Sequence, residues 1–225
     1  MRRSPLSVRC RPLLLLMFLA GPCWADPCEQ LAKPSVRVKL LDEPVSVDSQ
    51  YGFKTLTIMG GKITRPGNTV LGLTRGTAIV KFETHFTTIV ERSGQWECTS
   101  PQLTMSYGFS PMNVHVAREF TEGSCAYKEI YQHELRHVKT YQTHLAGIEK
   151  DLTDTLNARF ATGGPWRGPV GQSRARIQQE LTERWVPFIK REMNRVDAAQ
   201  ALVDSPEEYA RVANSCNGDI RKLTR

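Results

Sequence analysis

Several features are missing from this sequence, and each absence narrows the possible classes of protein. Beyond the first 25 residues there is no apolar run of the roughly 20 residues that a membrane-spanning helix needs, so we do not expect the remaining chain to span a membrane. No dense basic stripe with interleaved aromatic residues is present, so nucleic acid is not an expected partner. No C-x-x-C spacing occurs, which argues against a zinc site built from cysteines.

The first 25 residues resemble a secretory signal peptide. A basic start is followed by the apolar run 12–20 (PLLLLMFLA) and by Cys23–Trp24–Ala25, which resembles a cleavage site. A lipoprotein signal at Cys23 and a twin-arginine signal at Arg2–Arg3 fit less well. We therefore expect a secreted or periplasmic chain of residues 26–225 that forms a single domain. The signal contains four of the thirty Lys and Arg residues and no acidic residue, so its removal lowers the net charge from +7 to +3.

Four cysteines remain after the predicted cleavage, and in an exported chain this number suggests two disulfides. Three pairings are possible for four cysteines. We favour Cys98–Cys125, which would join a strand to the start of a helix, and Cys28–Cys216, which would join the two ends of the chain.

The first half of the mature chain, residues 26–123, has the pattern of strands. Thr, Val, Ile and Phe are frequent, and Gly, Pro and Asn interrupt them at short intervals, which favours hairpins. The expected strands cover residues 36–40, 55–59, 69–74, 77–91, 102–109 and 112–120. Residues 124–225 are mainly helical in pattern. Strands followed by helices predict an α+β fold with an antiparallel or mixed sheet in its first half.

Three helical regions are expected in the second half. The first begins with Ser124 as its N-cap and runs to about Phe160, which is long for an unbroken helix in a globular protein. We interpret the Gly/Pro-rich residues 161–171 as a connection between helices rather than a substrate loop. The second region covers residues 173–202, and Pro187 must kink or divide it. The last helix is predicted to begin at Ser205, which precedes a proline and two glutamates.

The strongest functional signal is the motif H-E-x-x-H at residues 133–137. On a helix, His133 and His137 lie one turn apart on the same face, so both imidazoles can bind one metal ion at about 2.0–2.1 Å. Glu134 leans toward the same ion and can accept a proton from a metal-bound water. Imidazole ligands together with a water-activating carboxylate predict Zn²⁺ as the cofactor.

A catalytic zinc usually has three protein ligands, so one more ligand must come from elsewhere in the chain. Glu192 is our prediction, because it falls within the apolar stripe of its helix, where a carboxylate must be paired, ligated or neutralised. Pairing with a basic residue such as Arg195 is the alternative. Glu180 is the second candidate ligand. His144 is a weaker one, because it lies about 10 Å beyond His137 on a straight helix.

Hydrolysis of an amide also requires a group that stabilises the developing oxyanion. Tyr141, one turn beyond the second histidine on the same helix face, is the predicted catalytic partner of Glu134. Tyr107 and His115, on the preceding strands, are alternatives. The strand 112–120 leads into the motif helix and is a candidate edge strand for pairing with an extended peptide.

With these residues the chain resembles the zincin metallopeptidases, and it is similar in size and export signal to the bacterial family described as predicted secreted zinc-dependent proteases. The resemblance implies that His133 and His137 are zinc ligands and that Glu134 is the general base. Two residues depart from the usual zincin pattern. Arg136 stands between the histidines, where uncharged residues are usual, and Lys139 stands where a hydrophobic residue is usual.

Two functions from different classes fit these observations. The first is an exported zinc-dependent hydrolase, a metallopeptidase that acts on a peptide or protein substrate. The second is a non-catalytic envelope protein with a zincin-like scaffold, whose histidines hold a structural metal or only pack. The third ligand and an open coordination position distinguish the two.

Overall fold

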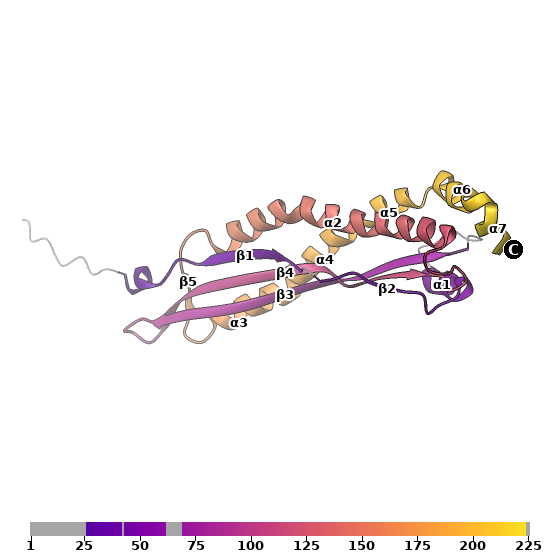
Figure 1. The fold of residues 1–225 in the computed structure, drawn as a ribbon. Helices are drawn as coiled ribbons and strands as arrows, with labels where there is room; N and C mark the ends of the chain where they lie inside the picture. Colours follow the sequence, from indigo (N-terminus) through magenta and orange to yellow (C-terminus); the bar gives the residue numbers. More distant parts are fainter. Residues whose placement is uncertain (1–25, 42, 62–68, 224–225) are drawn as a thin grey trace, which may run out of the picture.

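A hairpin of two long strands runs along the molecule, and the helices lie along it (Figure 1). The computed structural model describes residues 26–41, 43–61 and 69–223, so the predicted signal peptide and the turn at 66–68 lie outside the described residues. The strands are β1 (Ser35–Leu40), β2 (Ser46–Asp48), β3 (Gly72–Val90), β4 (Trp96–Val116) and β5 (Trp166–Pro169). The helices are α1 (Phe53–Gly60), α2 (Cys125–Phe160), α3 (Ser173–Glu180), α4 (Val186–Asn194), α5 (Asp197–Val203), α6 (Pro206–Asn214) and α7 (Asp219–Leu223).

The sheet is mixed, and β4 is its central strand. On one side β4 pairs with β3 in antiparallel register from Gly72↔Val116 to Val90↔Glu97. On the other side it pairs with β1 and β2 in parallel and with β5 in antiparallel. The prediction of an α+β fold with strands before helices is therefore confirmed. The purely antiparallel alternative is wrong, because β1 and β2 both run parallel to β4.

Two expectations about individual strands are wrong. The expected strand 102–109 and residues 112–116 of the expected strand 112–120 belong to one continuous strand, β4, because β3 pairs with it on both sides of a single register shift; residues 117–120 lie beyond its end. Residues 55–59, expected as a strand, lie in α1. This helix buries Leu56 and Gly60, four residues apart, and leaves Ile58 exposed. A short apolar run does not reveal its secondary structure, and here burial with helical spacing decides it.

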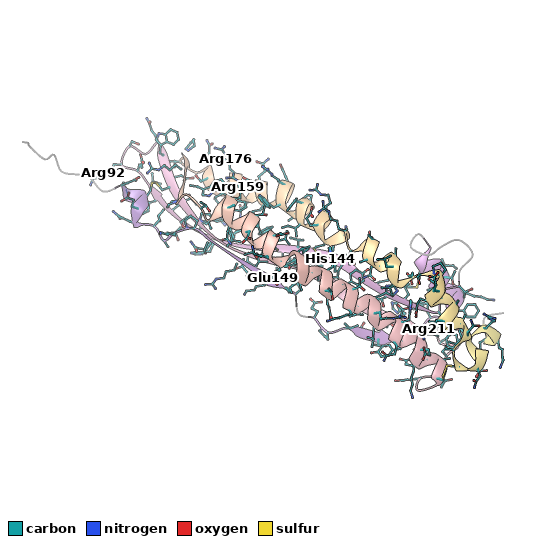
Figure 2. The ribbon with its side chains drawn as sticks, turned by 90° about the horizontal axis from the view of Figure 1, so that it is seen from above. Arg92, His144, Glu149, Arg159, Arg176 and Arg211 are labelled. Atoms are coloured by element: carbon teal, nitrogen blue, oxygen red, sulfur yellow. A yellow bond between two sulfur atoms is a disulfide. The ribbon has the colours of Figure 1, made fainter. Side chains whose placement is uncertain are left out.

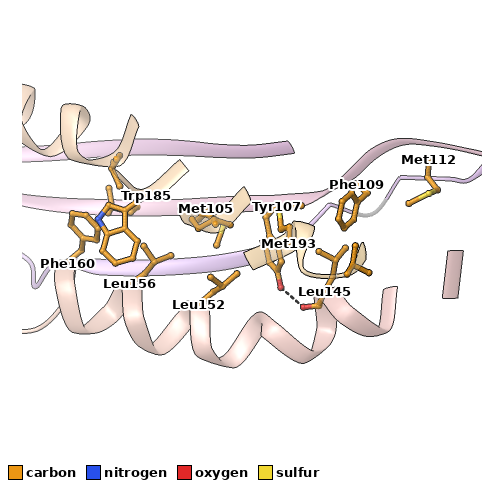
Figure 3. Close-up of a cluster of buried hydrophobic side chains, with 14 of the residues drawn as sticks. Met105, Tyr107, Phe109, Met112, Leu145, Leu152, Leu156, Phe160, Trp185 and Met193 are labelled. Atoms are coloured by element: carbon orange, nitrogen blue, oxygen red, sulfur yellow. Dashed lines mark hydrogen bonds between the residues drawn. The ribbon is translucent and has the colours of Figure 1, made fainter. Parts of the chain in front are cut away.

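The hydrophobic core lies between one face of the sheet and the helices. Alternate residues of β4 point to this face, and Figure 3 shows Met105, Tyr107 and Phe109 directed toward Leu145 and Leu152 of α2. On the opposite face the exposed side chains are polar or charged: Arg37, Lys39, Lys81, Glu83 and His85. Helices α2, α3 and α4 therefore cover the apolar face of the sheet, and Figure 2 shows α2 beside the later helices above the strands.

Helix α2 is a single helix of 36 residues, about 54 Å long at 1.5 Å per residue. The predicted N-cap is confirmed, because the Ser124 side chain accepts a hydrogen bond from the N–H of Tyr127. Its buried residues recur with helical spacing from Ala126 to Phe160, so packing against the sheet supports its whole length. The expected boundaries are confirmed.

The second helical region is divided at the predicted place. Pro187 lacks an N–H group and cannot donate to the preceding turn. The helix widens into a π-helical turn at Leu181–Trp185 and continues as α4. The predicted start of α6 is also confirmed, because Ser205 accepts a hydrogen bond from the N–H of Glu208. Part of the loop expected at 161–171 forms β5, which pairs with the start of β4.

Two disulfides form, as predicted, but the favoured pairing is wrong. The pairs are Cys28–Cys98 and Cys125–Cys216, with Cα–Cα distances of 5.5 and 5.8 Å. Cys98 lies near the start of β4 and Cys125 lies beyond its end. A strand of 21 residues spans roughly 65 Å at about 3.3 Å per residue, so these two cysteines cannot meet. Each disulfide therefore closes one end of the elongated molecule.

In the described part of the chain, no helix has both the length and the apolar character needed to cross a membrane. This includes α2, which has the length but carries charged side chains throughout its sequence.

Peptide mapping of the unreduced protein should recover Cys28 linked to Cys98 and Cys125 linked to Cys216. The double variant Cys125→Ser/Cys216→Ser should lower the free energy of unfolding in urea by about 2–5 kcal/mol, because the disulfide restricts the unfolded chain. Its mapping serves as the control, since the Cys28–Cys98 peptide should be unchanged. A peptide that links Cys98 to Cys125 would contradict the structure.

Candidate metal centre

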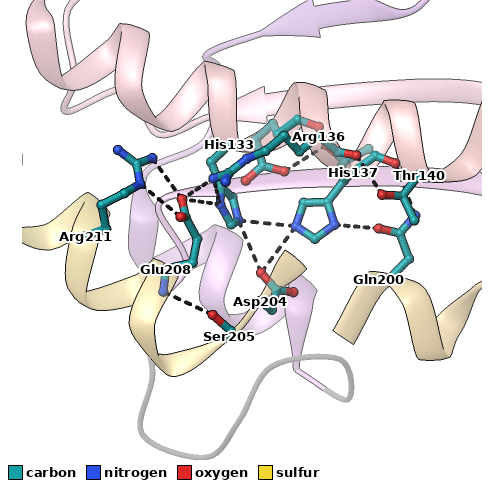
Figure 4. A network of polar contacts seen from close by, with 11 residues as sticks. His133, Arg136, His137, Thr140, Gln200, Asp204, Ser205, Glu208 and Arg211 are labelled. Atoms are coloured by element: carbon teal, nitrogen blue, oxygen red, sulfur yellow. Dashed lines mark hydrogen bonds and ion pairs between the residues drawn. The ribbon is translucent and has the colours of Figure 1, made fainter. Parts of the chain in front are cut away.

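The two motif histidines of α2 project from the helix toward the C-terminal helices (Figure 4). His133 and His137 are one turn apart, and their Nε2 atoms lie 3.2 Å from each other. The long helix positions them, because its buried side chains anchor it to the sheet on either side of the motif. Two imidazole nitrogens are thus presented to one point, as the sequence predicts.

Asp204 completes a set of three metal-ligand atoms. Its Oδ1 lies 3.2 Å from Nε2 of His133 and 3.2 Å from Nε2 of His137. Three ligands bound tetrahedrally to zinc at about 2.0–2.1 Å would lie about 3.3 Å from one another. The observed triangle therefore has the size that a zinc ion requires, and two imidazoles with one carboxylate are ligands that zinc prefers.

Glu192, the predicted third ligand, does not join this set. Its carboxylate lies 2.5 Å from Nη1 of Arg195, which is the alternative that the sequence left open. Its backbone carbonyl lies 2.9 Å from Nε2 of His144, so His144 is also directed away from the metal centre. A carboxylate in an apolar stripe needed a partner, and a neighbouring arginine supplies one in place of an ion.

Glu180 is not part of the site either, since it forms a bidentate ion pair with Arg159 at 2.6 and 2.8 Å. Asp204 escaped the sequence argument because it lies in the junction between α5 and α6 rather than within a helical stripe. A signal was nevertheless present. Asp204 directly precedes Ser205, the predicted N-cap of α6. Its position relative to the start of that helix is therefore set, and its side chain can be directed toward a neighbouring element.

Glu134 is buried beside the ligand triangle, and only 3% of its surface is exposed. The hydroxyl of Thr74 on β3 donates a hydrogen bond of 2.8 Å to its Oε2. A Cβ atom at Gly72 would lie 2.5 Å from its Oε1, so this close approach of β3 requires glycine. Burial raises the pKa of Glu134 above its usual value, although both histidines and the Thr74 hydroxyl act in the opposite direction.

Asp204 and His137 shift each other's pKa values. Burial acts to raise the pKa of Asp204, but hydrogen bonds and charge interactions with His133 and His137 lower it well below its usual value. Burial acts to lower the pKa of His137, but the carboxylates of Asp204 and Glu134 raise it overall. The pocket therefore stabilises a carboxylate at position 204 and positive charge near the imidazoles, as a cation site does.

Gln200 of α5 fixes the orientation of His137. Its Oε1 lies 2.6 Å from Nδ1 of His137, and its Nε2 donates to the backbone carbonyl of the same residue at 3.2 Å. Because its amide N–H group is engaged by that carbonyl, the amide oxygen must accept from Nδ1–H. The Nε2 lone pair of His137 is therefore free to bind a metal.

The ligands open into a pocket of about 370 Å³ between α2, β3 and the C-terminal helices. Its apolar walls come from all three: Val70, Leu71, Leu73, Ile130, Val212 and Ile220. Tyr141, predicted as a catalytic residue, lines this pocket, and burial raises the pKa of its hydroxyl. Tyr209 also lines it and was missed, since its neighbours in sequence carry no motif.

The two alternatives to Tyr141 lie elsewhere. Tyr107 is fully buried in the core, where its hydroxyl donates to the carbonyl of Leu145 at 2.9 Å. The Nδ1 atom of His115 lies 2.8 Å from a carboxylate oxygen of Asp48, and its ring contacts the ring of Tyr51. Neither residue lines the pocket beside the ligands.

The edge strand beside the pocket is β3 rather than the predicted segment 112–120. Residues 112–116 belong to β4, which has β3 on one side and β2 on the other. Within the described residues β3 pairs with β4 alone, and the pocket is lined by its first residues, 72–74, and by residues 69–71, which precede it. The prediction that the segment 112–120 is an edge strand is therefore wrong, because its residues in β4 lie between two paired strands.

Comparison with family models, curated proteins and solved structures finds no match to this chain. The resemblance to the zincins therefore stays a prediction that rests on the motif. What the structure adds is the arrangement of the ligand atoms, with Asp204 as their third member.

We expect Glu134→Gln to stabilise the metal-free protein at neutral pH. The folded pKa of Glu134 is raised, so the wild type loses stability as pH rises from the unfolded pKa of about 4.3 through the folded value. Gln has no charge to bury and can still accept from Thr74, so its advantage should grow with pH. Each unit of pKa shift is worth about 1.4 kcal/mol, which urea unfolding at several pH values would detect.

Glu97→Gln is the matched control with the opposite sign. Burial acts to raise the pKa of Glu97, but hydrogen bonds from the N–H groups of Gly171 and Ser173 lower it overall. Its contribution to stability is therefore present at neutral pH and is lost as pH falls. Gln should lower the free energy of unfolding at pH 7 by about 1–3 kcal/mol. Equal effects of both substitutions would contradict the assigned environments.

Gly72→Ala should destabilise the protein by about 1–3 kcal/mol, because the new methyl group would overlap Glu134 and a methyl group of Ile130. Gly147→Ala is the control, since no atom lies within 4 Å of a Cβ at that exposed position in α2. It should stabilise the helix by roughly 0.5–1 kcal/mol. Thermal unfolding of both variants measures the difference, and a neutral Gly72→Ala would disprove the close contact.

Proposed function

We propose that this chain is an exported zinc-dependent hydrolase, and specifically a metallopeptidase. The observation that carries the proposal is the triangle of His133 Nε2, His137 Nε2 and Asp204 Oδ1, with edges of 3.2 Å. Three protein ligands leave one tetrahedral position for water, which is typical of catalytic zinc sites. When bound, zinc supplies a Lewis acid that polarises a carbonyl and lowers the pKa of water toward about 7.

Glu134 is the residue that we assign to proton transfer. It follows His133 directly and lies beside the ligand triangle without belonging to it. Thr74 holds one of its oxygens, which fixes the orientation of the carboxylate. Burial raises its pKa, so the carboxylate can hold a proton after taking it from water and then pass it to the leaving amine.

A peptide substrate is supported by the surroundings of the site. The start of β3 lines the pocket, and an extended peptide can pair with the free side of such a strand. The apolar walls of the pocket suit an uncharged side chain of the substrate. The hydroxyl of Tyr141 stays protonated because burial raises its pKa, and it can donate to the developing oxyanion.

Export is supported by two independent features. The sequence begins with a predicted signal peptide, and the described chain contains two disulfides, which persist in oxidising compartments such as the periplasm. A secreted or periplasmic location follows as part of the proposal.

The decisive experiment measures zinc in residues 26–225 by elemental analysis, with the disulfides formed. One zinc per chain is expected, and it should be lost in His133→Ala and Asp204→Ala. Glu134→Ala should keep its zinc but hydrolyse a labelled peptide mixture about 10²–10⁴-fold more slowly, because only proton transfer is removed. Glu192→Ala is the matched control and should retain both zinc and activity.

Two results would favour the non-catalytic envelope protein instead. One is the absence of bound zinc after reconstitution, and the other is zinc that survives Asp204→Ala through some other set of ligands. Zinc binding without hydrolysis of any peptide would leave a metal protein but remove the peptidase assignment.

A further inference from the structure

Arg136, the unusual cation within the motif, belongs to a chain of charges that joins α2 to α6 (Figure 4). Its Nη2 forms an ion pair with Oε1 of Glu208. Arg211 donates to the same carboxylate at 2.8 and 2.9 Å and reaches Glu129 of α2 at 2.8 Å. Glu208 therefore lies between two arginines, and only 12% of its side chain is exposed.

The same two groups approach the outer nitrogen of His133. Nη2 of Arg136 lies 3.0 Å from Nδ1 of His133, and Oε1 of Glu208 lies 3.4 Å from it. A guanidinium can only donate a hydrogen bond, whereas an ionised carboxylate can only accept one. The two neighbours therefore favour opposite tautomers of the neutral imidazole.

Only one of these tautomers can bind a metal through Nε2. If Arg136 donates to Nδ1, the ring proton must be on Nε2, which faces Asp204 and His137. If Glu208 accepts from Nδ1–H, the Nε2 lone pair is available for the ion. His137 differs, because Gln200 contacts its Nδ1 and selects the metal-binding tautomer, and no competing donor is found there among the described residues.

We propose that Glu208 is a positioning residue that selects the metal-binding tautomer of His133, and that Arg136 is the competing donor that Glu208 draws away. The inference rests on the proposed metal centre. It goes beyond that centre, because it makes the affinity for zinc depend on two residues outside the ligand set, Glu208 and Arg136, which compete for Nδ1 of His133. It also explains how an arginine can be tolerated between two ligands, since its charge is held by α6.

The two halves of the pair should then respond in opposite ways. Glu208→Met removes the acceptor and releases Arg136, so the dissociation constant for zinc should rise about 10–100-fold, the usual effect of losing a partner of a ligand histidine. Arg136→Met removes the competing donor and leaves Glu208 free to accept from His133, so its dissociation constant should be unchanged or lower. The double variant should recover most of the affinity that Glu208→Met loses.

A merely structural role of the ion pair gives different results. If the pair only fastened α6 to α2, both single variants would weaken zinc binding equally and the double variant would recover nothing. Glu129→Gln is the control, because it breaks the neighbouring ion pair of Arg211 between the same two helices without touching His133. It should leave the dissociation constant unchanged.

The tautomer itself is measured by the ¹⁵N chemical shifts of the His133 ring in the metal-free protein. Glu208→Met should raise the population of the Nε2–H tautomer, and Arg136→Met should lower it. Unchanged tautomer populations, or equal losses of zinc affinity in both single variants, would overturn the proposal. Because this readout needs neither zinc nor hydrolysis, it remains decisive even if the peptidase assignment fails.

Discussion

The constraint on which the structure depends is the one-sided burial of the β3–β4 hairpin. A two-stranded ribbon of about 20 residues per strand is not stable in water by itself, and here it presents an apolar face and a polar face. The apolar face must be covered along its whole length, so the chain needs a helix as long as the ribbon. Helix α2 meets this need with 36 residues, and α3 and α4 fill the remaining width. The motif is thus carried by an element that the core holds rigidly.

The candidate metal centre lies where this rigid helix meets the last segment of the chain. His133, Glu134 and His137 come from α2, Gly72 and Thr74 from the start of β3, and Asp204, Gln200 and Glu208 from the segment around α5 and α6. The Cys125–Cys216 disulfide ties this last segment to the first turn of α2. A site assembled from three distant parts of the sequence can keep ligand atoms 3.2 Å apart only if each part is held independently, and packing, close β3 contact and the disulfide each hold one of them.

Burying ionisable side chains near the site costs folding free energy, and the placement of these side chains is consistent with the proposed function. Glu134 is buried with a raised pKa and one hydroxyl partner, which weakens the fold but suits the proton transfer that we propose for it. By contrast, Glu97 is equally buried but receives two backbone N–H groups, so it stabilises the connection to α3. The same residue type thus serves opposite purposes, and the number of donors aimed at the carboxylate separates them.

The sequence by itself determined the long helix and its Ser124 cap, the division at Pro187, the order of strands before helices and the pair of histidines one turn apart. These features are local, because periodicity, capping and the missing N–H of proline act within a few residues. Only the tertiary structure decided the third residue of the candidate ligand set, the disulfide pairing, the central place of β4 and the neutralisation of Arg136. Each of these depends on contacts between segments that are 60 or more residues apart in the sequence. The apolar stripe of a helix does not indicate which segment it will pack against. Glu192 and Asp204 show the difference, since the arginine that pairs with Glu192 is three residues away in the sequence, whereas the two histidines beside Asp204 are 67 and 71 residues away.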